Sequence, residues 1–403
     1  ILVLMALALG YFVFDKFVLS VSREASIIEA ARQQGHDAAL VSAYGDKSIA
    51  VLPFVNLSGD PGQEFFSDGI SEELLNLLAQ IPELRVIARS SSFSFKGKDI
   101  VVPEVARQLH VAHVLEGSMR KDGNRVRITA QLVEAHSDSH LWSESYDRNV
   151  TDIFAVQDEI ANAITNALKV KLGLVASAEV LPVSTEITDF DAYSAYLHGR
   201  NLIHLRGREN LENAVRELER ALRLNEKFAP AHAHLAIAIA LLANDASSYG
   251  TLSIAEVVRR AVPHLDRAQE LEPGLPEIYA GRALLALKRN DLQATVEQAR
   301  KALVINPNYA DALNWLHVTL NAQGRYREAD SILEKILFVD PLAISGRINY
   351  INWLSSLDRT VEAHAMADQL LDRNPDFGYM MHADISLIYE GRIADGLSWA
   401  LQA

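Results

Sequence analysis

Apolar and small residues recur at helical spacing through the second half of the chain. Between residues 307 and 341, the bulky, turn, aromatic, small and apolar positions are Leu313, Leu316, Gly324, Tyr326, Ala329 and Ile336. Residues three or four apart share one face of a helix, so this order places an apolar face on each of two helices, with a turn at the glycine. The pattern predicts two helices that approach each other closely at the small positions.

This helix pair repeats along the chain. Four prolines stand 34 residues apart, each after an acidic or amide residue: Pro273, Pro307, Pro341 and Pro375. The period is the length of a tetratricopeptide repeat (TPR), and residues 191–403 resemble an array of about six such repeats, the last incomplete. Because one repeat cannot bury its own apolar face, repeats stack and present an elongated concave surface. We therefore expect an all-α TPR solenoid that binds another protein or a peptide.

The pattern changes to alternating strands and helices over residues 47–172. Apolar and β-branched runs predict strands over 48–56, 84–88 and 111–116, and helical spacing predicts helices over 103–109 and 153–172. Asp122-Gly123, between two segments of alternating polarity, predicts a β-hairpin. Ser71 followed by Glu72 and Glu73 predicts the start of a helix, where acids interact favourably with the helix dipole. Together these elements predict an α/β domain with a mixed sheet.

The same region carries a family resemblance. Residues 47–172 resemble the TolB amino-terminal-like domain over long stretches, among them SIAVLPFVNLSGDPGQEFFSDGISEELL, VAHVLEGSMRKDGNRVRITAQLVEA and HLWSESYDRNVTDIFAVQDEIA. In bacterial proteins such a domain commonly precedes TPR repeats. It follows adenylate cyclase catalytic domains or winged-helix regulator domains, or it belongs to membrane-anchored repeat proteins. The resemblance implies an accessory domain without catalytic residues, in a signalling or scaffold protein.

The amino terminus begins with the uninterrupted apolar run ILVLMALALGYFVF. We interpret residues 1–19 as part of a transmembrane helix, residues 20–46 as a juxtamembrane helical stalk and residues 173–190 as a linker. A signal-peptide remnant is the alternative for the apolar run, although no basic segment precedes it. The start at Ile1 and the incomplete last repeat favour a fragment of a longer protein. With the family resemblance, this predicts a protein of the bacterial inner membrane whose soluble part is periplasmic.

Composition and charge narrow the chemistry. The 403 residues carry a formal charge of −14 and no cysteine. The missing cysteines exclude disulfides, thiolate catalysis and Cys-based zinc sites, and the acidic balance argues against sequence-independent binding to nucleic acid. Phosphate-loop and nucleophile-elbow strings do not occur. We expect no catalytic residue, cofactor or metal within this chain.

Two histidine pairs have spacings that merit consideration as metal ligands: His110 with His113, and His136 with His140. The first pair falls at a predicted helix-to-strand junction and the second in a predicted loop. Neither places two imidazoles on one helical face, as paired zinc ligands on a helix require. We interpret all four as structural or solvated histidines.

The concave surface of the repeats is the better candidate for a functional site. In the register set by the prolines, the inward face of the first helix of successive repeats takes Asn314, Trp315, Asn321, Asn349, Asn352, His382 and Tyr389. Amide side chains both donate and accept hydrogen bonds, so they can hold an extended peptide backbone. The alternative is that these are ordinary solvated helix positions.

Three hypotheses for function follow. The first is a non-catalytic, membrane-anchored scaffold or sensor with a peptide-binding TPR groove. The second is the regulatory tail of a membrane adenylate cyclase, and the third is the sensory part of a winged-helix transcription regulator. In the last two, the catalytic or DNA-binding domain would lie outside the present chain.

Overall fold

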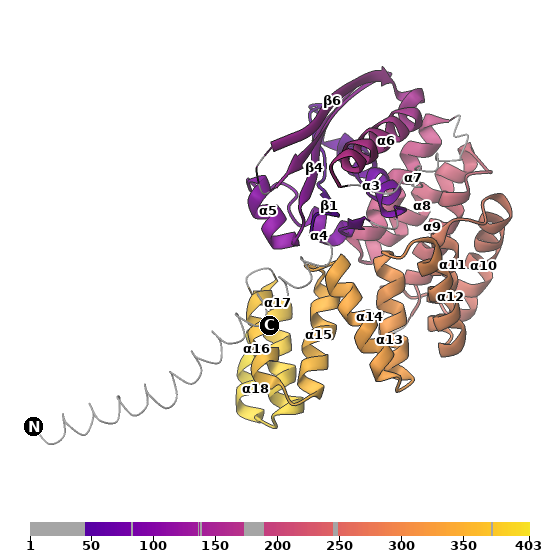
Figure 1. Cartoon of the computed structure of the whole chain (residues 1–403). Coiled ribbons are helices and arrows are strands. Elements are labelled where there is room, and N and C mark those ends of the chain that lie inside the picture. Colours follow the sequence, from indigo (N-terminus) through magenta and orange to yellow (C-terminus); the bar gives the residue numbers. More distant parts are fainter. Residues whose placement is uncertain are drawn as a thin grey trace, which may run out of the picture. The chain divides into compact units, whose positions relative to one another are not determined.

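The computed structural model describes residues 45–81, 84–135, 137, 139–172, 189–244, 249–371 and 374–403. These residues form two compact units (Figure 1). The first unit is 46–343, and the second comprises 344–403 together with Gly45. The first unit contains a sheet and eight helices of the repeat type, and the second contains helices only. A mixed-sheet region followed by helices consistent with a TPR solenoid confirms this part of the predicted fold class.

The sheet has the strand order β3-β1-β4-β5-β6, with β2 pairing beside β4. Its strands are β1 (Ser48–Val51), β2 (Val55–Asn56), β3 (Arg85–Val86), β4 (His113–Asp122), β5 (Arg125–Glu134) and β6 (Ser139–Asn149). β1 pairs in parallel with β3 and β4, whereas β4, β5 and β6 pair antiparallel. The predicted hairpin is confirmed, because Asp122 lies opposite Arg125 across the turn.

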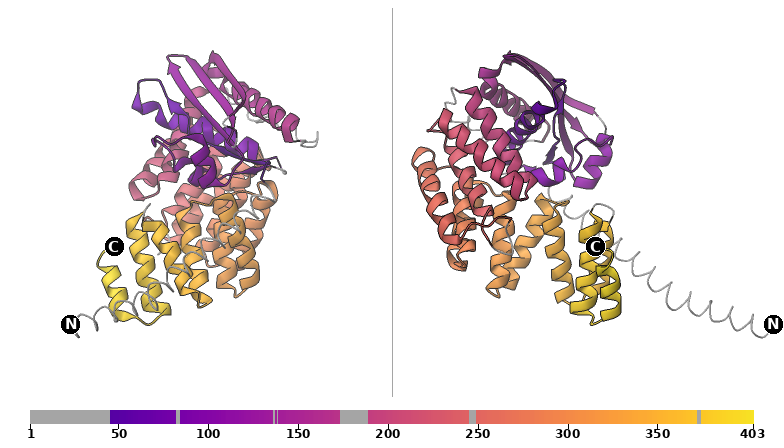
Figure 2. Two further views of the ribbon diagram at one scale, coloured as in Figure 1. Left: turned by 60° about the vertical axis from the view of Figure 1, so that its left-hand side comes forward. Right: turned by 180° about the vertical axis from the view of Figure 1, so that it is seen from behind.

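Alternation along the strands sets the two faces of the sheet. In β5, Val126 and Ile128 are buried in the main core while Arg125 and Arg127 are exposed on the other face, as period-two side-chain placement requires. The main core contains α3 (Glu64–Ala79) and α6 (Ile153–Leu172). A smaller core on the opposite face contains α5 (Val102–Leu109). The two further views in Figure 2 show the strands as one layer with helices packed against it.

Several predicted elements need correction. The single strand expected over 48–56 is two strands, β1 and β2, and β6 was not expected at all. Helix α3 begins at Glu64, seven residues before the predicted start at Ser71. The side chain of Asp60 accepts a hydrogen bond from the Gly62 amide and caps the short 3₁₀ helix Pro61–Gln63 that leads into α3. Ser71 instead lies inside the helix, where its hydroxyl accepts a hydrogen bond from the Phe54 amide.

The repeats of the first unit form four helix pairs: α7 (Phe190–Leu205) with α8 (Arg208–Leu224), α9 (Ala229–Leu241) with α10 (Ile254–Leu271), α11 (Pro276–Lys288) with α12 (Leu292–Ile305), and α13 (Ala310–Ala322) with α14 (Tyr326–Val339). The predicted turn at Gly324 has φ = 71°, a backbone conformation that glycine adopts without strain. Ala302 and Ala329 are fully buried at the close contacts between helices. The periodicity thus predicted both the turn and the small positions.

One hydrophobic core runs from the sheet through α3 and α6 into α7 to α14. A separate core contains Ile351, Leu354, Ala363, Met366 and Leu370 in the second unit. That unit consists of α15 (Ile344–Ser356), α16 (Thr360–Leu371), α17 (Pro375–Asp384), the π-helical turn η4 (Ile385–Tyr389) and α18 (Ile393–Ala400). The sheet and the first four repeats therefore share a core, whereas the last two repeats have their own.

The membrane predictions require a correction. The proposed transmembrane helix over residues 1–19, most of the stalk over 20–46 and most of the linker over 173–190 lie outside the described residues. Within the part of the chain that the structure describes, every helix is too short or too polar to cross a membrane. This finding overturns the predicted location in the bacterial inner membrane.

Candidate functional site

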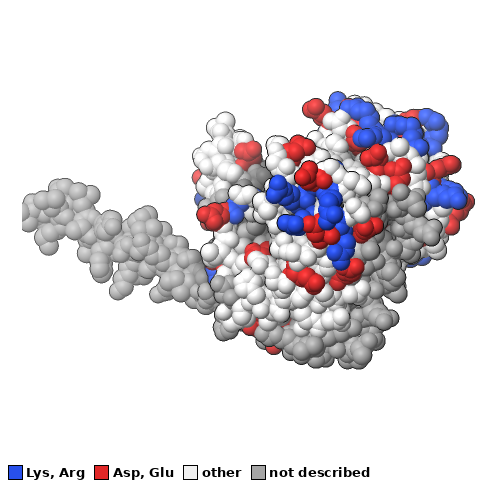
Figure 3. All heavy atoms as spheres, turned by 90° about the horizontal axis from the view of Figure 1, so that it is seen from above, with Lys and Arg blue, Asp and Glu red and all other residues white. Residues whose placement is uncertain are grey.

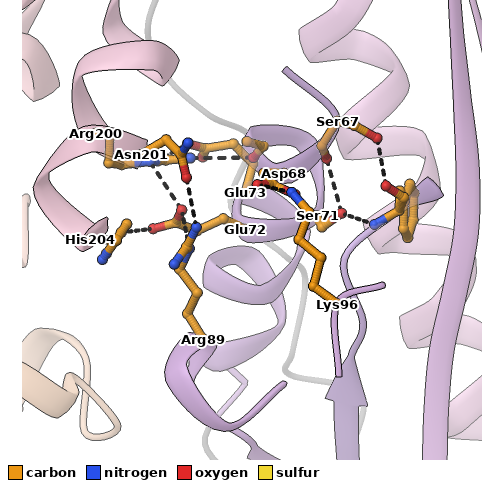
Figure 4. Close-up of polar contacts among 12 residues, drawn as sticks. Ser67, Asp68, Ser71, Glu72, Glu73, Arg89, Lys96, Arg200, Asn201 and His204 are labelled. Carbon is orange, nitrogen blue, oxygen red and sulfur yellow. Dashed lines mark hydrogen bonds and ion pairs between the residues drawn. The ribbon is translucent and has the colours of Figure 1, made fainter. Parts of the chain in front are cut away.

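A polar cluster lies where α3 of the sheet region contacts α7, the first repeat helix (Figure 4). We call it the α3–α7 cluster and define it by Glu72, Glu73, Arg89, Arg200 and His204. The two glutamates come from α3, Arg89 begins the short helix α4 (Arg89–Phe93), and Arg200 and His204 lie one turn apart on α7. Five ionisable side chains from three helices therefore meet inside the first unit.

Arg200 is the centre of this cluster. Its side chain is only 2% exposed, yet it contacts both glutamates: Nε lies 3.4 Å from Oε2 of Glu72, and Nη1 pairs with Glu73. Nη1 also donates to the Tyr196 hydroxyl at 3.0 Å, and Nη2 donates to the backbone oxygen of Gly69 at 3.3 Å. A guanidinium with five donors in a planar fork can satisfy several acceptors at once, which suits it to such a buried position.

Glu72 is held by three basic groups. Arg89 Nε donates to its Oε2 at 3.0 Å, and His204 Nε2 donates to its Oε1 at 2.8 Å. Burial alone would raise the pKa of Glu72, but Arg200, His204 and Arg89 hold it well below its usual range. Burial in turn lowers the pKa of His204, although the carboxylate opposes this shift. Glu72 therefore remains charged at all physiological pH values, and the cluster is an ionic contact with no proton to exchange at Glu72.

Closely packed side chains extend the same contact. Asn201 accepts a hydrogen bond from Arg89 Nη2 at 3.0 Å, and the buried Gln157 of α6 donates to the Tyr193 hydroxyl of α7 at 2.9 Å. Gly69 of α3 leaves room for Leu197 of α7, since a Cβ at this glycine would lie 2.7 Å from a Leu197 methyl carbon. Both α3 and α6 are thus fixed against the first repeat helix.

A second contact joins the sheet region to the end of the fourth repeat. The amide of Ala88 donates to the backbone oxygen of Val339 at 2.8 Å, and Arg85 Nε donates to that of Phe338 at 2.9 Å. Asp340 accepts hydrogen bonds from the amide and the hydroxyl of Ser91, at 3.1 and 2.5 Å, near the start of α4. The sheet region therefore contacts both the first and the last helix of the series α7 to α14.

The predicted groove residues divide between the two units. Asn314, Trp315 and Asn321 lie on α13 in the first unit, whereas Asn349, Asn352, His382 and Tyr389 lie in residues 344–403. Trp315 is 8% exposed and belongs to the main core. His382 is 2% exposed and stacks on Trp399, with ring centroids 4.4 Å apart. Both side chains contribute packing, and neither is available to a ligand groove.

The remaining predicted residues are more accessible. Asn352 is exposed, Tyr389 is 39% exposed, and Asn314 and Asn349 are half-buried. Asn321 is half-buried and donates through Nδ2 to His317 Nε2 at 3.0 Å, while His317 Nδ1 donates to the backbone oxygen of Ala329. On α15, Tyr350 and Trp353 stack with ring centroids 5.4 Å apart and are half-buried. This helix thus combines one exposed and one half-buried amide with two half-buried aromatic rings.

Of the four histidines weighed as metal ligands, three lie in the described part of the chain. His110 ends α5 in a left-handed conformation with φ = 52°, and Nδ1 of the buried His113 bonds to the backbone oxygen of Ser48 at 3.1 Å. His140 is exposed on β6, and His136 lies outside the described residues. Over the described part of the chain, no group of three or more His, Asp and Glu side chains is arranged to hold a metal ion.

The basic residues of the hairpin face solvent. Arg125 and Arg127 both pair with Asp147 of the neighbouring strand. On the face in Figure 3, Lys and Arg side chains are interspersed with Asp and Glu. This mixture agrees with a solvated sheet face rather than with a uniform basic patch for phosphates.

Sequence reasoning missed the α3–α7 cluster. Glu72 and Glu73 were interpreted as helix-dipole partners, which is wrong because they lie in the middle of α3 and pair with Arg200. No local signal joins residues so far apart in the sequence. The one available hint was the spacing of Arg200, which has Leu197 and Ile203 three residues to either side and so shares a helix face with apolar residues; a buried arginine requires an acidic partner.

Comparisons with known proteins find matches to parts of the chain. A family model described as the second domain of HilA/YgeH-like transcriptional regulators matches residues 45–163. A curated relative, named "Putative adenylate cyclase 3" from Rhizobium meliloti (strain 1021), is 46% identical over 190 residues. The match covers 47% of this chain and 32% of the relative, so the chain spans about a third of that protein's length.

Solved structures similar to the chain include TPR proteins, and the three described below are each less than 20% identical to it. A TPR protein of Thermus thermophilus is 17% identical with a TM-score of 0.38, covering 50% of this chain and 99% of that one. The pilF protein of Pseudomonas aeruginosa is 14% identical with a TM-score of 0.40, covering 53% and 90%. YrrB, titled a TPR protein with an unusual peptide-binding site, is 17% identical with a TM-score of 0.30, covering 47% and 90%.

Proposed function

We propose that this chain is a non-catalytic protein-interaction segment whose partner-binding surface lies on α15 in the second unit. The observation that carries the proposal is a difference in accessibility between first helices of the repeats. In α9 every residue except Pro230 is buried, whereas in α15 only Gly346, Ile351, Leu354 and Ser355 are buried. A first helix with no accessible face cannot line a groove, so α9 serves as support.

The chemistry of α15 suits an extended peptide. Asn349 and Asn352 can both donate to and accept from a peptide backbone, and the Tyr350–Trp353 stack offers apolar and aromatic contact area next to them. Aromatic residues of this kind dominate binding energy in many interfaces. The partner is therefore a protein segment that presents an extended backbone with an apolar side chain.

A direct test uses the asparagines in two matched pairs. A partner captured from bacterial extract would be identified, purified and titrated calorimetrically against the wild type, the N349A/N352A variant and the N314A/N321A variant. We expect the first variant to weaken binding about tenfold, since each lost hydrogen bond contributes on the order of 1 kcal/mol or less. The α13 variant should bind as the wild type does. Unchanged affinity of a folded N349A/N352A variant, with circular dichroism as the control, would contradict the assignment to α15.

A second candidate function rests on the likeness to the Rhizobium protein. In this proposal the chain is the regulatory part of a larger adenylate cyclase, and the TolB-like resemblance of residues 47–172 agrees with an accessory role. The purified chain should form no cyclic AMP from ATP, and removal of the matching region from the Rhizobium protein should change its cyclic AMP formation severalfold. Unchanged formation in that deletion would count against this candidate. The match to a transcription-regulator domain leaves the winged-helix hypothesis as the competitor.

A further inference from the structure

We propose that a pair of histidines in the second unit, His364 and His382, shares a single additional proton and forms a pH-sensitive latch between α16 and α17. The proposal stands independently of the proposed function. Nδ1 of His364 lies 2.7 Å from Nδ1 of His382. At this distance one nitrogen must donate and the other must accept.

The opposite ring nitrogens determine how many protons the pair holds. Nε2 of His364 lies 3.2 Å from Oε2 of Glu390, and Nε2 of His382 lies 3.0 Å from Oδ1 of Asp368. Ionised carboxylates only accept, so both Nε2 atoms carry a proton. The Nδ1 contact then requires one further proton, on one of the two rings. Three protons on four nitrogens make one imidazolium and one neutral imidazole.

The surroundings place this charge on His364. His382 is 3% exposed at its side chain, whereas His364 is 23% exposed and is the ring beside Glu390. Burial lowers the pKa of His382; the Asp368 carboxylate opposes this shift and His364 reinforces it. The neutral ring of His382 stacks on Trp399 of α18, with an interplanar angle of 19°.

Charges from every neighbouring element complete the site. Asp368 comes from α16 and Glu390 follows η4. Arg392 pairs with Glu390 at 3.2 Å and also with Asp395 of α18. From α17, Tyr379 stacks on Trp399, and from α15 Arg347 Nη1 donates to Gln369 Oε1 at 3.1 Å. The two carboxylates that accept from the histidines are therefore balanced by one shared proton and by Arg392.

This geometry predicts a loss of stability on both sides of neutral pH. Removing the shared proton leaves two lone pairs facing each other across the Nδ1 contact. Adding a second proton places two cations in contact. The lowered pKa of His382 determines how stability changes at acid pH. Folding favours the neutral ring, so this group stabilises the folded state above its unfolded-state pKa, and the stabilisation is lost as the pH falls. The contact between α16 and α17 should thus be strongest in an intermediate pH window.

The test is hydrogen exchange of the full chain, followed by mass spectrometry of peptides from residues 360–371 and 375–400. Protection, corrected for intrinsic exchange, should pass through a maximum between about pH 5 and pH 9. On either side of the maximum it should fall about tenfold, which is the effect expected for one charge-assisted hydrogen bond. The H364Q variant should lose this maximum. The matched control is the H232Q variant, which should retain the protection maximum. It removes the other Nδ1 pair of the described chain, His232 with His264 at 2.9 Å in the first unit.

A second measurement needs no variant. Nitrogen NMR shifts of the wild-type histidines at neutral pH should show three protonated ring nitrogens in the pair. Protection that does not change with pH, a maximum that persists in folded H364Q, or two neutral or two cationic rings at neutral pH would overturn the latch.

Discussion

The α3–α7 cluster and the His364–His382 pair both place charge between helices, but they use different ionisable groups. Arg200 remains protonated under all physiological conditions, and its carboxylate partner Glu72 has a pKa held well below the usual range. Histidine is the side chain whose ordinary pKa lies closest to neutral pH, and burial lowers the pKa of His382. The first arrangement is a permanent connection and the second responds to conditions. The permanent connection lies inside the unit whose main core runs from the sheet into the repeats, and the responsive one lies in the small unit with its own core.

The largest expected effect comes from breaking the permanent connection. Replacing Arg200 by Met leaves Glu72 and Glu73 buried without their central partner, and the loss of one partner from a buried pair costs about 3–5 kcal/mol. The urea midpoint of the first unit should fall accordingly. Arg107→Ala is the control, since Arg107 is 73% exposed and pairs only at the surface with Glu104, and its midpoint should equal that of the wild type.

The next effect tests the close approach of α3 to α7. In Gly69→Ala, the added Cβ would lie 2.7 Å from Leu197, and overpacking of this kind costs about 1–3 kcal/mol. Alanine also has the higher helix propensity, by about 1 kcal/mol, so a net gain in stability would mean that the helices can separate at little cost. Gly274→Ala, in the turn between α10 and α11, is the control for the steric effect alone, because its added Cβ would meet no non-neighbouring atom within 4 Å.

A smaller effect concerns Glu277, whose pKa is influenced by both Glu73 and Arg200. Burial raises the pKa of Glu277 to about 7. A carboxyl whose pKa is raised by folding stabilises the protein below its unfolded pKa, and this contribution is lost as the pH rises through 7. Glu277→Gln should therefore raise stability by about 1–2 kcal/mol at pH 8 and change little at pH 4. Equal effects at both pH values would show that this carboxyl does not titrate near neutrality.

The sequence predicted those parts of the fold that rest on local patterns. The hairpin at Asp122-Gly123 and the turn at Gly324 were correct because turn residues and side-chain periodicity act over a few positions. Strand β6 was missed because its sequence, SHLWSESYDRN, is polar on much of both faces, as an edge strand can be. The start of α3 was missed because the true signal was the cap at Asp60, which came earlier than the apolar stripe.

The candidate sites were less predictable from the sequence. Arg200 meets Glu72 only after the sheet region and the repeats have packed together, so no spacing rule could pair them. Trp315 and His382 were assigned to a groove from their repeat register, but tertiary packing buries both. The Asn349 and Asn352 assignment remains a prediction, supported by the accessibility of α15.

The most direct test of the central comparison is native-state hydrogen exchange over increasing urea concentrations. Peptides from the sheet region, 48–172, and from the repeats, 190–339, should lose protection together at one urea concentration, because they share a core and the α3–α7 cluster. Peptides from 344–400 should lose protection separately, at a lower concentration. Loss of protection in 48–172 and 190–339 at different urea concentrations in the wild type would contradict the account.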